Sequence, residues 1–211
     1  MKKILCIIPI RSKSKSIKNK NIKFFKGKPL AYYAIKKACG SKVFNKVVVA
    51  TDSDFYINLL SKYFHKKRID FFKRSKNSSK DTANTEIVIK EVIKKYKNFD
   101  YIAIIQVTSP FLKISHIIGS KKKFFENKLD SLFSCYKKYE WLWTFKNKKL
   151  KSLNYNHTRR PQRQFFQKVI FENGAIYIFK KNGFIKFSNR LFGKIGCYEM
   201  NEEDSLDINF P

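Results

Sequence analysis

The sequence predicts an α/β fold with a mainly parallel sheet flanked by helices, because buried strands alternate with amphipathic helices along it. Apolar runs rich in β-branched residues are typical of strands covered on both faces, and they occupy residues 4–9, 46–50 and 101–106. Apolar residues recur at helical spacing over residues 30–38, 57–64, 87–95 and 114–125. This alternation indicates βαβ units.

The second half of the chain departs from this alternation. Residues 131–135 fit a further strand, after which residues 136–170 are polar and aromatic-rich with little periodicity. Strand-like runs return at 175–179 and 196–200. Neither an internal repeat nor a Pro/Gly/Ser linker interrupts the sequence. We therefore predict a single domain over residues 1–211, with 136–170 as an inserted arm.

The composition is strongly basic, with 46 Lys and Arg residues against 16 Asp and Glu residues and a formal net charge of +30. Such a surface attracts polyanions, which leaves nucleic acid, anionic membranes and small phosphorylated substrates open as partners. A Lys-rich composition can also reflect an AT-rich genome. The basic residues occur in short groups such as 121–123, without a long basic arm. We therefore expect a charged surface and no specific nucleic-acid partner.

Cysteine usage and hydropathy favour a soluble, cytoplasmic protein. The four cysteines lie far apart and include no Cys-x-x-Cys pair, so neither a zinc site nor a disulfide framework is indicated. The apolar start of the chain leads into Arg11 and a Lys-rich stretch without a small-residue cleavage site, unlike a signal peptide. No apolar run approaches the roughly 18 residues that cross a bilayer, so no membrane partner is expected.

Open parallel sheets bind ligands beyond the carboxyl ends of their strands, which directs attention to the loops after Pro9, Ala50 and Gln106. Residues 8–21, at the first of these ends, contain five basic residues and three serines. Backbone N–H groups, hydroxyls and cations at such a place form a site for phosphate oxygens. A solvated basic loop is the alternative. The glycines and the Gly-Lys-Ser/Thr ending of a Walker loop are missing.

The sequence resembles the cytidylyltransferases that make CMP-activated sialic, legionaminic or pseudaminic acids. Their first loop typically reads Pro-Ala-Arg-x-Gly-Ser-Lys-Gly-Ile/Leu-Pro-x-Lys-Asn. The matching residues here are Pro9, Arg11, Ser14, Lys15, Ile17, Lys20 and Asn21. Further matches follow in order, and they are Gly27-Lys28-Pro29-Leu30, Thr51-Asp52-Ser53, Asp81-Thr82-Ala83, Gln106-Val107-Thr108-Ser109-Pro110, Arg163-Gln164, Glu172-Asn173-Gly174-Ala175-Ile176-Tyr177 and Ser205-Leu206-Asp207-Ile208-Asn209.

The resemblance implies a Rossmann-like nucleotidyltransferase fold and transfer of CMP from CTP to the anomeric hydroxyl of a nonulosonic acid, with release of pyrophosphate. It implies catalytic roles for Arg11, Lys20 and Asp207. The residues implied to bind CTP are Arg11, Ser14, Lys15, Lys20, Asn21, Arg74, Ala83 and Thr85. Gln106 would contact the acidic nine-carbon sugar, and the cofactor Mg²⁺ would be held by Asp207 and Asn209.

The resemblance also implies a homodimer, because in this family the segment corresponding to residues 136–170 reaches into a partner subunit. Arg163 lies in this arm. It would complete the neighbouring site and offer its planar guanidinium to the carboxylate of the sugar.

Several of these residues have simpler alternative roles. Arg74 could be a surface arginine, and Gln106 could be structural at the end of its strand. The Thr51-Asp52-Ser53 stretch follows a strand, where such residues often cap the next helix, so Asp52 could serve as the cap. The three histidines have no metal-ligand spacing and are interpreted as mostly surface residues.

The sequence departs from the family pattern at several positions. Lys13 and Ser16 replace glycines and Lys18 replaces a proline in the first loop, while Val107 precedes Thr-Ser-Pro in place of proline. Glycine allows close approach of the backbone to phosphate, so its loss can reduce that approach. The alternative hypotheses are a catalytically weakened nucleotide- or sugar-binding relative and a basic nucleic-acid-binding protein. An enzyme using the eight-carbon sugar Kdo is disfavoured, since its first loop follows a different pattern.

The metal motif generates a first prediction, because Asn209 replaces the second aspartate usual in the family. Asn209 can offer only a neutral carbonyl oxygen, so Mg²⁺ should be held more weakly than by two carboxylates. We expect Asn209→Asp to lower the Mg²⁺ concentration for half-maximal turnover and Asp207→Ala to nearly abolish turnover, both measured by pyrophosphate release. An unchanged Mg²⁺ response in Asp207→Ala would contradict the metal assignment.

Overall fold

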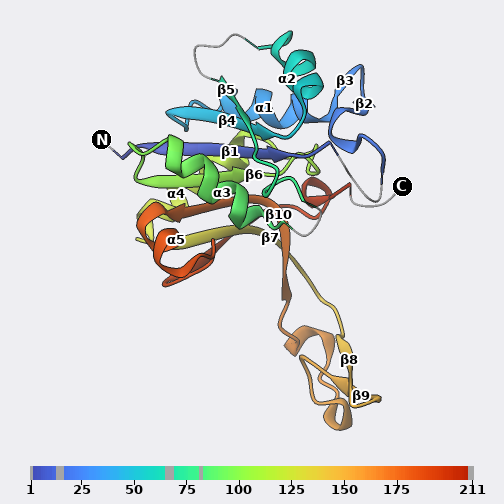
Figure 1. The fold of residues 1–211 in the computed structure, drawn as a ribbon. Coiled ribbons are helices and arrows are strands. Elements are labelled where there is room, and N and C mark those ends of the chain that lie inside the picture. The colour runs from blue at the N-terminus through green and yellow to red at the C-terminus, as the bar shows by residue number, and fades with distance from the viewer. Residues whose placement is uncertain (1, 13–16, 65–68, 81–82, 209–211) are drawn as a thin grey trace.

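The fold is known from a computed structural model that describes residues 2–12, 17–64, 69–80 and 83–208. The described residues form a central seven-stranded sheet (Figure 1). Its strands, in spatial order from one edge to the other, are β11 (Ile195–Glu199), β7 (Ser131–Lys138), β10 (Val169–Lys180), β6 (Tyr101–Ile105), β1 (Ile4–Ile10), β4 (Lys46–Thr51) and β5 (Ile69–Lys73).

The sheet is mainly parallel, which confirms the predicted α/β fold. Strand β1 pairs in parallel with β4 on one side and with β6 on the other, and β4 pairs in parallel with β5. Only β10 runs antiparallel to its neighbours β6 and β7, while β11 is parallel to β7. The chain turns outward in both directions from β1, so the carboxyl ends of β1 and β6 flank the point where strand order reverses, the usual ligand crevice of open α/β sheets.

Helices cover both faces of the sheet, and the alternation along β1 shows how. Ile4, Cys6 and Ile8 belong to one buried cluster with α1 (Leu30–Gly40) and α4 (Ile114–Glu126). Leu5 and Ile7 belong to a second cluster with α3 (Thr85–Lys95) and α5 (Lys181–Phe187). Burying each such side chain contributes about 2 kcal/mol. This two-sided burial explains why the first strand is an unbroken apolar run.

The remaining elements are short. Helix α2 (Asp54–Ser61) follows β4, and β2 (Phe24–Phe25) and β3 (Lys28–Pro29) form a small hairpin before α1. Two strands, β8 (Trp143–Lys146) and β9 (Lys149–Ser152), form a second hairpin. The 3-10 turns are η1 (Lys20–Ile22), η2 (His157–Arg159), η3 (Arg163–Phe165) and η4 (Glu203–Ser205). Among the helices of the described residues, none combines the length and apolar character needed to span a membrane.

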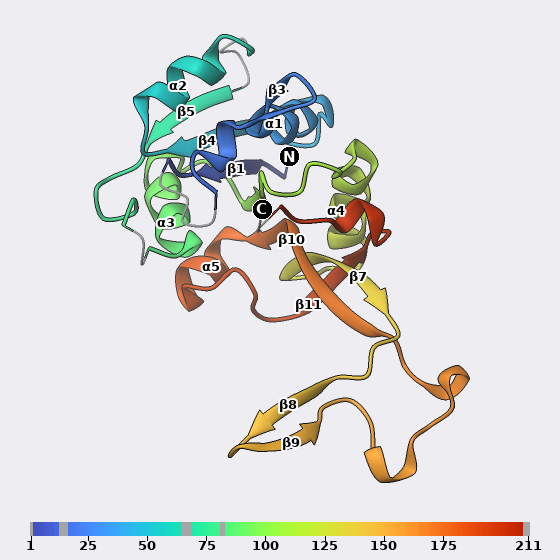
Figure 2. The ribbon, with the colours of Figure 1, turned by 90° about the vertical axis from the view of Figure 1, so that its right-hand side faces the viewer.

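The segment between β7 and β10 leaves the sheet and projects from the body of the molecule (Figures 1 and 2). Its aromatic side chains pack on one another, with Trp141 stacked on Phe166 at 4.1 Å between ring centroids and the Arg160 guanidinium 4.3 Å from the Trp141 ring. The β8–β9 hairpin was not predicted, because neither short strand has a buried face to produce an apolar alternation.

Candidate functional site

The loop after β1 is held in place by side chains from two other segments. The Asn21 side-chain amide donates to the Arg11 carbonyl at 2.8 Å, and Asn21 is buried. The Tyr56 hydroxyl of α2 donates to Asn19 Oδ1 at 3.2 Å, where Asn19 has a left-handed backbone with φ 55°. Asparagine tolerates this conformation better than most residues. These contacts fix both ends of the predicted phosphate loop.

Part of this loop lies outside the described residues. The predicted CTP ligands Ser14 and Lys15 fall in the gap at residues 13–16, as does the glycine replacement at Ser16. Asn21, predicted to bind the triphosphate, uses its amide nitrogen to hold the loop itself.

Asp52, at the end of β4, ties the phosphate loop to the neighbouring strand. It accepts hydrogen bonds from the Ser12 backbone N–H at 2.8 Å and from the Ser12 hydroxyl at 2.9 Å. The N-cap of α2 is Ser53, whose hydroxyl accepts from the Tyr56 N–H at 3.3 Å. The alternative of a capping role for Asp52 is therefore wrong, because the following residue takes that position and Asp52 binds the loop.

Three predicted catalytic residues from distant parts of the sequence interact electrostatically. Partial burial lowers the pKa of Lys20, the negative charge of Asp207 acts in the opposite direction, and the positive charge of Arg11 lowers it further. Asp207 reaches this place because the Ile208 N–H donates to the Thr108 carbonyl, in the loop after β6, at 2.8 Å. The carboxyl ends of β1 and β6 thus share two cations and one carboxylate.

Arg74 is buried, so the alternative of a surface arginine is wrong. Its backbone N–H donates to the Thr51 carbonyl at 2.8 Å. Burial lowers its pKa, the carboxylates of Asp52 and Glu91 oppose this, and Arg11 reinforces it. Among the described residues, nothing accepts a hydrogen bond from Arg74 Nε. A buried donor of this kind is costly unless a ligand or water satisfies it.

Glu91 of α3 holds the segment that carries Arg74. Its carboxylate accepts from the hydroxyl of Ser78 at 2.5 Å and from both the hydroxyl and the backbone N–H of Ser75. Burial alone would raise the pKa of Glu91, but these hydrogen bonds outweigh it and lower the pKa. A charged carboxylate therefore stands beside the Arg74 guanidinium.

Ala83 and Thr85, the other residues expected near the nucleoside, lie at the start of α3. The Ala83 N–H donates to the Lys80 carbonyl at 3.0 Å. Asn84 caps the helix by accepting from the Ile87 N–H at 3.1 Å, so Thr85 is the first helical residue. Both belong to the same β5–α3 connection as Arg74, although Asp81 and Thr82 between them lie outside the described residues.

The predicted sugar ligands are separated within one chain. Gln106 follows β6 and is half-buried, and its backbone N–H donates to the Ala175 carbonyl of β10 at 3.1 Å. Arg163 is exposed in the projecting arm, with its guanidinium 5.8 Å from the Tyr139 ring. The arm that carries Arg163 projects away from the sheet (Figure 2), so in one chain Arg163 is not near the carboxyl ends of β1 and β6.

Sequence reasoning missed an apolar contact beside the cations. A cavity of about 120 Å³ adjoins Lys20 and is lined otherwise by Ile17, Lys23, Phe24, Phe25, Leu30 and Ile208. Ile208 thus packs against the phosphate loop from the far end of the chain. No periodicity marks this contact, because it joins single residues from unrelated segments.

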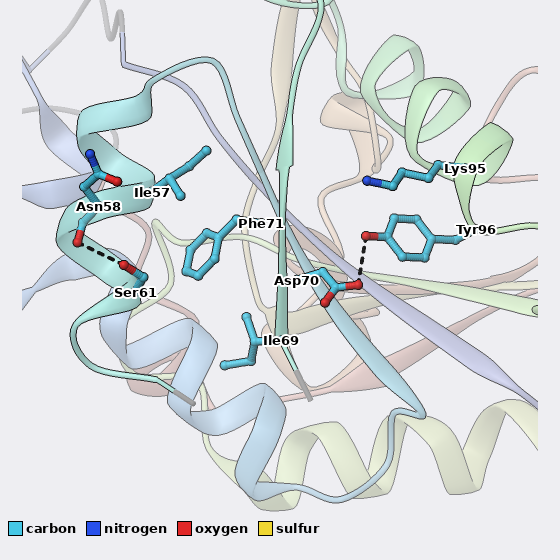
Figure 3. Close-up of a pocket in the computed structure, with 8 residues that line it drawn as sticks. All are labelled: Ile57, Asn58, Ser61, Ile69, Asp70, Phe71, Lys95 and Tyr96. Carbon is cyan, nitrogen blue, oxygen red and sulfur yellow. Dashed lines mark hydrogen bonds between the residues drawn. The ribbon is translucent and has the colours of Figure 1, made fainter. Parts of the chain in front are cut away.

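A larger cavity, of about 510 Å³, lies at the β5 edge of the sheet, between α2 and α3 (Figure 3). Its carboxylate, Asp70, pairs with Lys46 at 2.8 Å and accepts from the Tyr96 hydroxyl at 3.0 Å. The pKa of Tyr96 is raised well above its usual range, mainly by burial and in addition by this hydrogen bond. The charged groups gathered at the strand ends, rather than cavity size, mark the functional site.

The described residues include part of the predicted donor set for the metal. Within residues 2–12, 17–64, 69–80 and 83–208, no cluster of three or more His, Cys, Asp or Glu side chains could hold a metal ion. Asp207 stands at the cationic site, whereas Asn209 lies outside the described residues. One carboxylate fits Mg²⁺, which is often bound by one or two carboxylates together with substrate phosphates.

Comparison with known proteins places the chain in a family. Residues 5–210 match the family model described as Cytidylyltransferase. N-acylneuraminate cytidylyltransferase A of Danio rerio is 32% identical, over 98% of this chain and 48% of that protein. Post-translational flagellin modification protein B of Campylobacter coli is 29% identical, over 99% of this chain and 91% of that protein. The chain spans about half the length of the N-acylneuraminate cytidylyltransferases it matches.

A solved structure supports the fold independently. The structure of CMP:2-keto-3-deoxy-manno-octonic acid synthetase complexed with CTP aligns with a TM-score of 0.68, over 94% of this chain and 90% of that chain. At 15% sequence identity this likeness shows the fold alone. Because the family model covers nearly the whole chain, the protein belongs to the cytidylyltransferase family.

Proposed function

We propose that this chain transfers CMP from CTP to the anomeric hydroxyl of a nonulosonic acid of the sialic, legionaminic or pseudaminic type, releasing pyrophosphate. The observation that carries the proposal is the meeting of Arg11, Lys20 and Asp207 at the strand ends of a chain in the cytidylyltransferase family. The names of relatives such as the N-acylneuraminate cytidylyltransferases support the acidic sugar as acceptor.

In this proposal Arg11 and Lys20 bind the triphosphate oxygens and neutralise their charge. The oxygen of the sugar 2-hydroxyl attacks the α-phosphorus and its proton is released to solvent. The bond from the α-phosphorus to the bridging oxygen of the β-phosphate breaks, and pyrophosphate leaves. Phosphoryl-type transfer requires mainly positioning and electrostatic stabilisation from the protein. The Asp52–Ser12 hydrogen bonds supply positioning, since they keep the loop that carries Arg11 next to β4.

The nucleoside would lie against the β5–α3 connection, where Arg74, Ala83 and Thr85 are found. The buried Arg74 Nε, which lacks a partner among the described residues, could donate to an oxygen of the cytosine or ribose. Glu91 fixes the segment that carries Arg74, as its bonds to Ser75 and Ser78 show.

Mg²⁺ is the proposed cofactor, with Asp207 as the described protein ligand. Bound there, it would polarise phosphate oxygens and stabilise the charge that develops on the leaving pyrophosphate. We also propose a cytoplasmic location, where CTP would be available.

A homodimer is the proposed assembly, because the arm offers apolar surface that one chain leaves uncovered. Phe145, Leu150, Leu153 and Phe165 of this segment are between 60% and 75% exposed. Exposed apolar groups at this density indicate a protein interface. The arm also carries Arg163, which would reach the sugar carboxylate in the partner's site.

The nucleotide preference tests the proposal directly. We expect CTP to be used in preference to UTP, ATP and GTP with sialic, legionaminic and pseudaminic acids as acceptors, because Arg74 and its neighbours would contact cytosine and ribose. The measurement is pyrophosphate release across this panel. Equal rates with UTP would count heavily against the assignment, and CTP binding without turnover would indicate the catalytically weakened relative.

Removal of one cation tests the phosphate loop. Arg11→Ala should lower turnover by about 10²-fold or more, in the range seen when a transition-state electrostatic partner is lost. Lys3→Ala is the matched control, since it removes one positive charge at the opposite end of the same strand, where Lys3 is exposed. Steady-state kinetics should show a turnover rate near the wild-type value for the control. A normal rate in Arg11→Ala would mean that the loop is only a basic surface.

Mixing two inactive variants tests whether Arg163 acts across the dimer. Arg163→Ala and Asp207→Ala should each be inactive alone. After co-refolding, a random mixture of two-fold dimers should regain about a quarter of wild-type activity, because half of the dimers each contain one intact site. If mixed dimers isolated through a different affinity tag on each variant have no activity, Arg163 lies outside the partner's site.

A further inference from the structure

The segment leading to Asp207 contains two consecutive buried polar residues. Asp204 and Ser205, in the short turn η4, are only 7% and 6% exposed, whereas the preceding Glu203 is exposed. Asp207 lies three residues after Asp204 in the sequence. A buried carboxylate is costly unless it is paired and hydrogen-bonded, so the partners of Asp204 show what this turn is fixed to.

Asp204 is bound by the start of α4. Its Oδ2 atom lies 2.7 Å from Lys113 Nζ and 3.5 Å from His116 Nε2. His116 is buried, so the sequence interpretation of a surface residue is wrong for this histidine. Its Nδ1 atom accepts the Lys113 backbone N–H at 3.1 Å, which places the proton of the neutral ring on Nε2, facing Asp204.

The electrostatic surroundings favour that neutral form of His116. Burial lowers the pKa of His116, the Asp204 carboxylate opposes this, and Lys113 and Lys37 reinforce it. Lys37 of α1 donates to the Pro110 carbonyl at 2.5 Å, in the same loop that leads to Lys113. Asp204 therefore contacts Lys113 and His116 at the start of α4, and its charge also acts on Lys37 of α1.

Ser205 is bound on the other side of the turn. Its hydroxyl accepts from the Asn173 side-chain amide at 2.9 Å and donates to the Asn201 carbonyl at 2.9 Å. Asn173 in turn accepts from the Ser134 hydroxyl at 2.6 Å. The turn is thus attached to α4 through Asp204 and to β7 and β10 through Ser205.

We propose that Asp204 is a positioning residue, which holds the backbone of residues 206–208 so that the Asp207 carboxylate faces the cations of the phosphate loop. The contacts of Asp204 precede the Ile208–Thr108 hydrogen bond in the chain, and that bond places Asp207 beside Lys20. The consequence for metal and nucleotide binding rests on the proposed function; the effect on the backbone does not.

The test compares the same carboxylate-to-amide replacement at two neighbouring residues. Asp204→Asn removes a buried, paired charge, and Glu203→Gln removes an exposed charge from the same turn. One readout is hydrogen exchange of the Ile208 amide in the metal-free protein, which we expect to accelerate about tenfold in Asp204→Asn alone. The other is Mg²⁺ affinity in the presence of CTP without acceptor sugar, measured by calorimetry, which should fall about tenfold in the same variant.

A second variant tests whether the effects of Asp204→Asn come from loss of this contact rather than from general unfolding. Lys113→Met removes the partner cation while Lys113 itself is largely exposed, so the fold should survive, with smaller changes in the same direction. The variant that combines Asp204→Asn with Lys113→Met should show nearly the same exchange rate and Mg²⁺ affinity as Asp204→Asn alone, because the two residues act as a pair.

The outcomes separate the two proposals. Equal values for Asp204→Asn and Glu203→Gln, or a loss of Mg²⁺ affinity without faster Ile208 exchange, would overturn the positioning role. Faster exchange with unchanged Mg²⁺ affinity would overturn it as well, since the turn would then be tethered without effect on Asp207. Absence of CTP turnover in the wild-type protein would instead refute the proposed function, while hydrogen exchange at Ile208 would still decide whether Asp204 holds the backbone.

Discussion

Two-sided burial of β1 is the constraint on which the other features depend. Five consecutive side chains of this strand, Ile4 to Ile8, are at most 1% exposed, and they alternate between two hydrophobic clusters. A strand in this position cannot carry a charged side chain, because an uncompensated buried charge costs several kcal/mol. Charged side chains that could act on a ligand can therefore follow only where the strand ends, at Arg11. The neighbouring strands β4 and β6 are buried in the same way, so their first polar residues collect at the same edge.

Within a chain of net charge +30, the few carboxylates near this edge have a large organising effect. Asp52 binds the Ser12 end of the loop, Glu91 binds the Arg74 segment, and Asp207 faces Lys20. Each carboxylate lies where neighbouring cations would otherwise repel one another. Such repulsion is visible in the pKa of Arg74, which the positive charge of Arg11 lowers. Long-range attraction of anionic substrates by the remaining lysines is limited by screening at cellular salt. The specific site is therefore set by short contacts rather than by the overall charge.

The parts of the fold that could be predicted from sequence are those that produce a local pattern. Strands β1, β4 and β6 were predicted because burial on both faces yields an apolar run. Strand β5 was missed because it lies at an edge, where only Ile69 is buried and Asp70 interrupts the run. The roles of Asp52 and Asp204 could not be predicted, since their partners lie 40 and 91 residues away in sequence. A sequence motif predicts that a residue lies at the site. Its tertiary contacts determine whether its side chain is available to a ligand or instead holds a neighbouring residue in position.

Strand β10 joins the arm to the site through one continuous stretch of backbone. Its outer part, from Val169 to Glu172, pairs with the end of β7, and its inner part, from Ile176 onward, lies between β6 and the start of β7. The register shifts between these parts, where Gly174 has φ +72°, a conformation that favours glycine. Within this irregular stretch, the Ala175 carbonyl accepts the Gln106 N–H. A partner bound to the arm would therefore act on the same strand that anchors Gln106. The projecting arm and the loop that carries Gln106 are thus connected through one strand, although Arg163 and Gln106 lie on different segments of the chain.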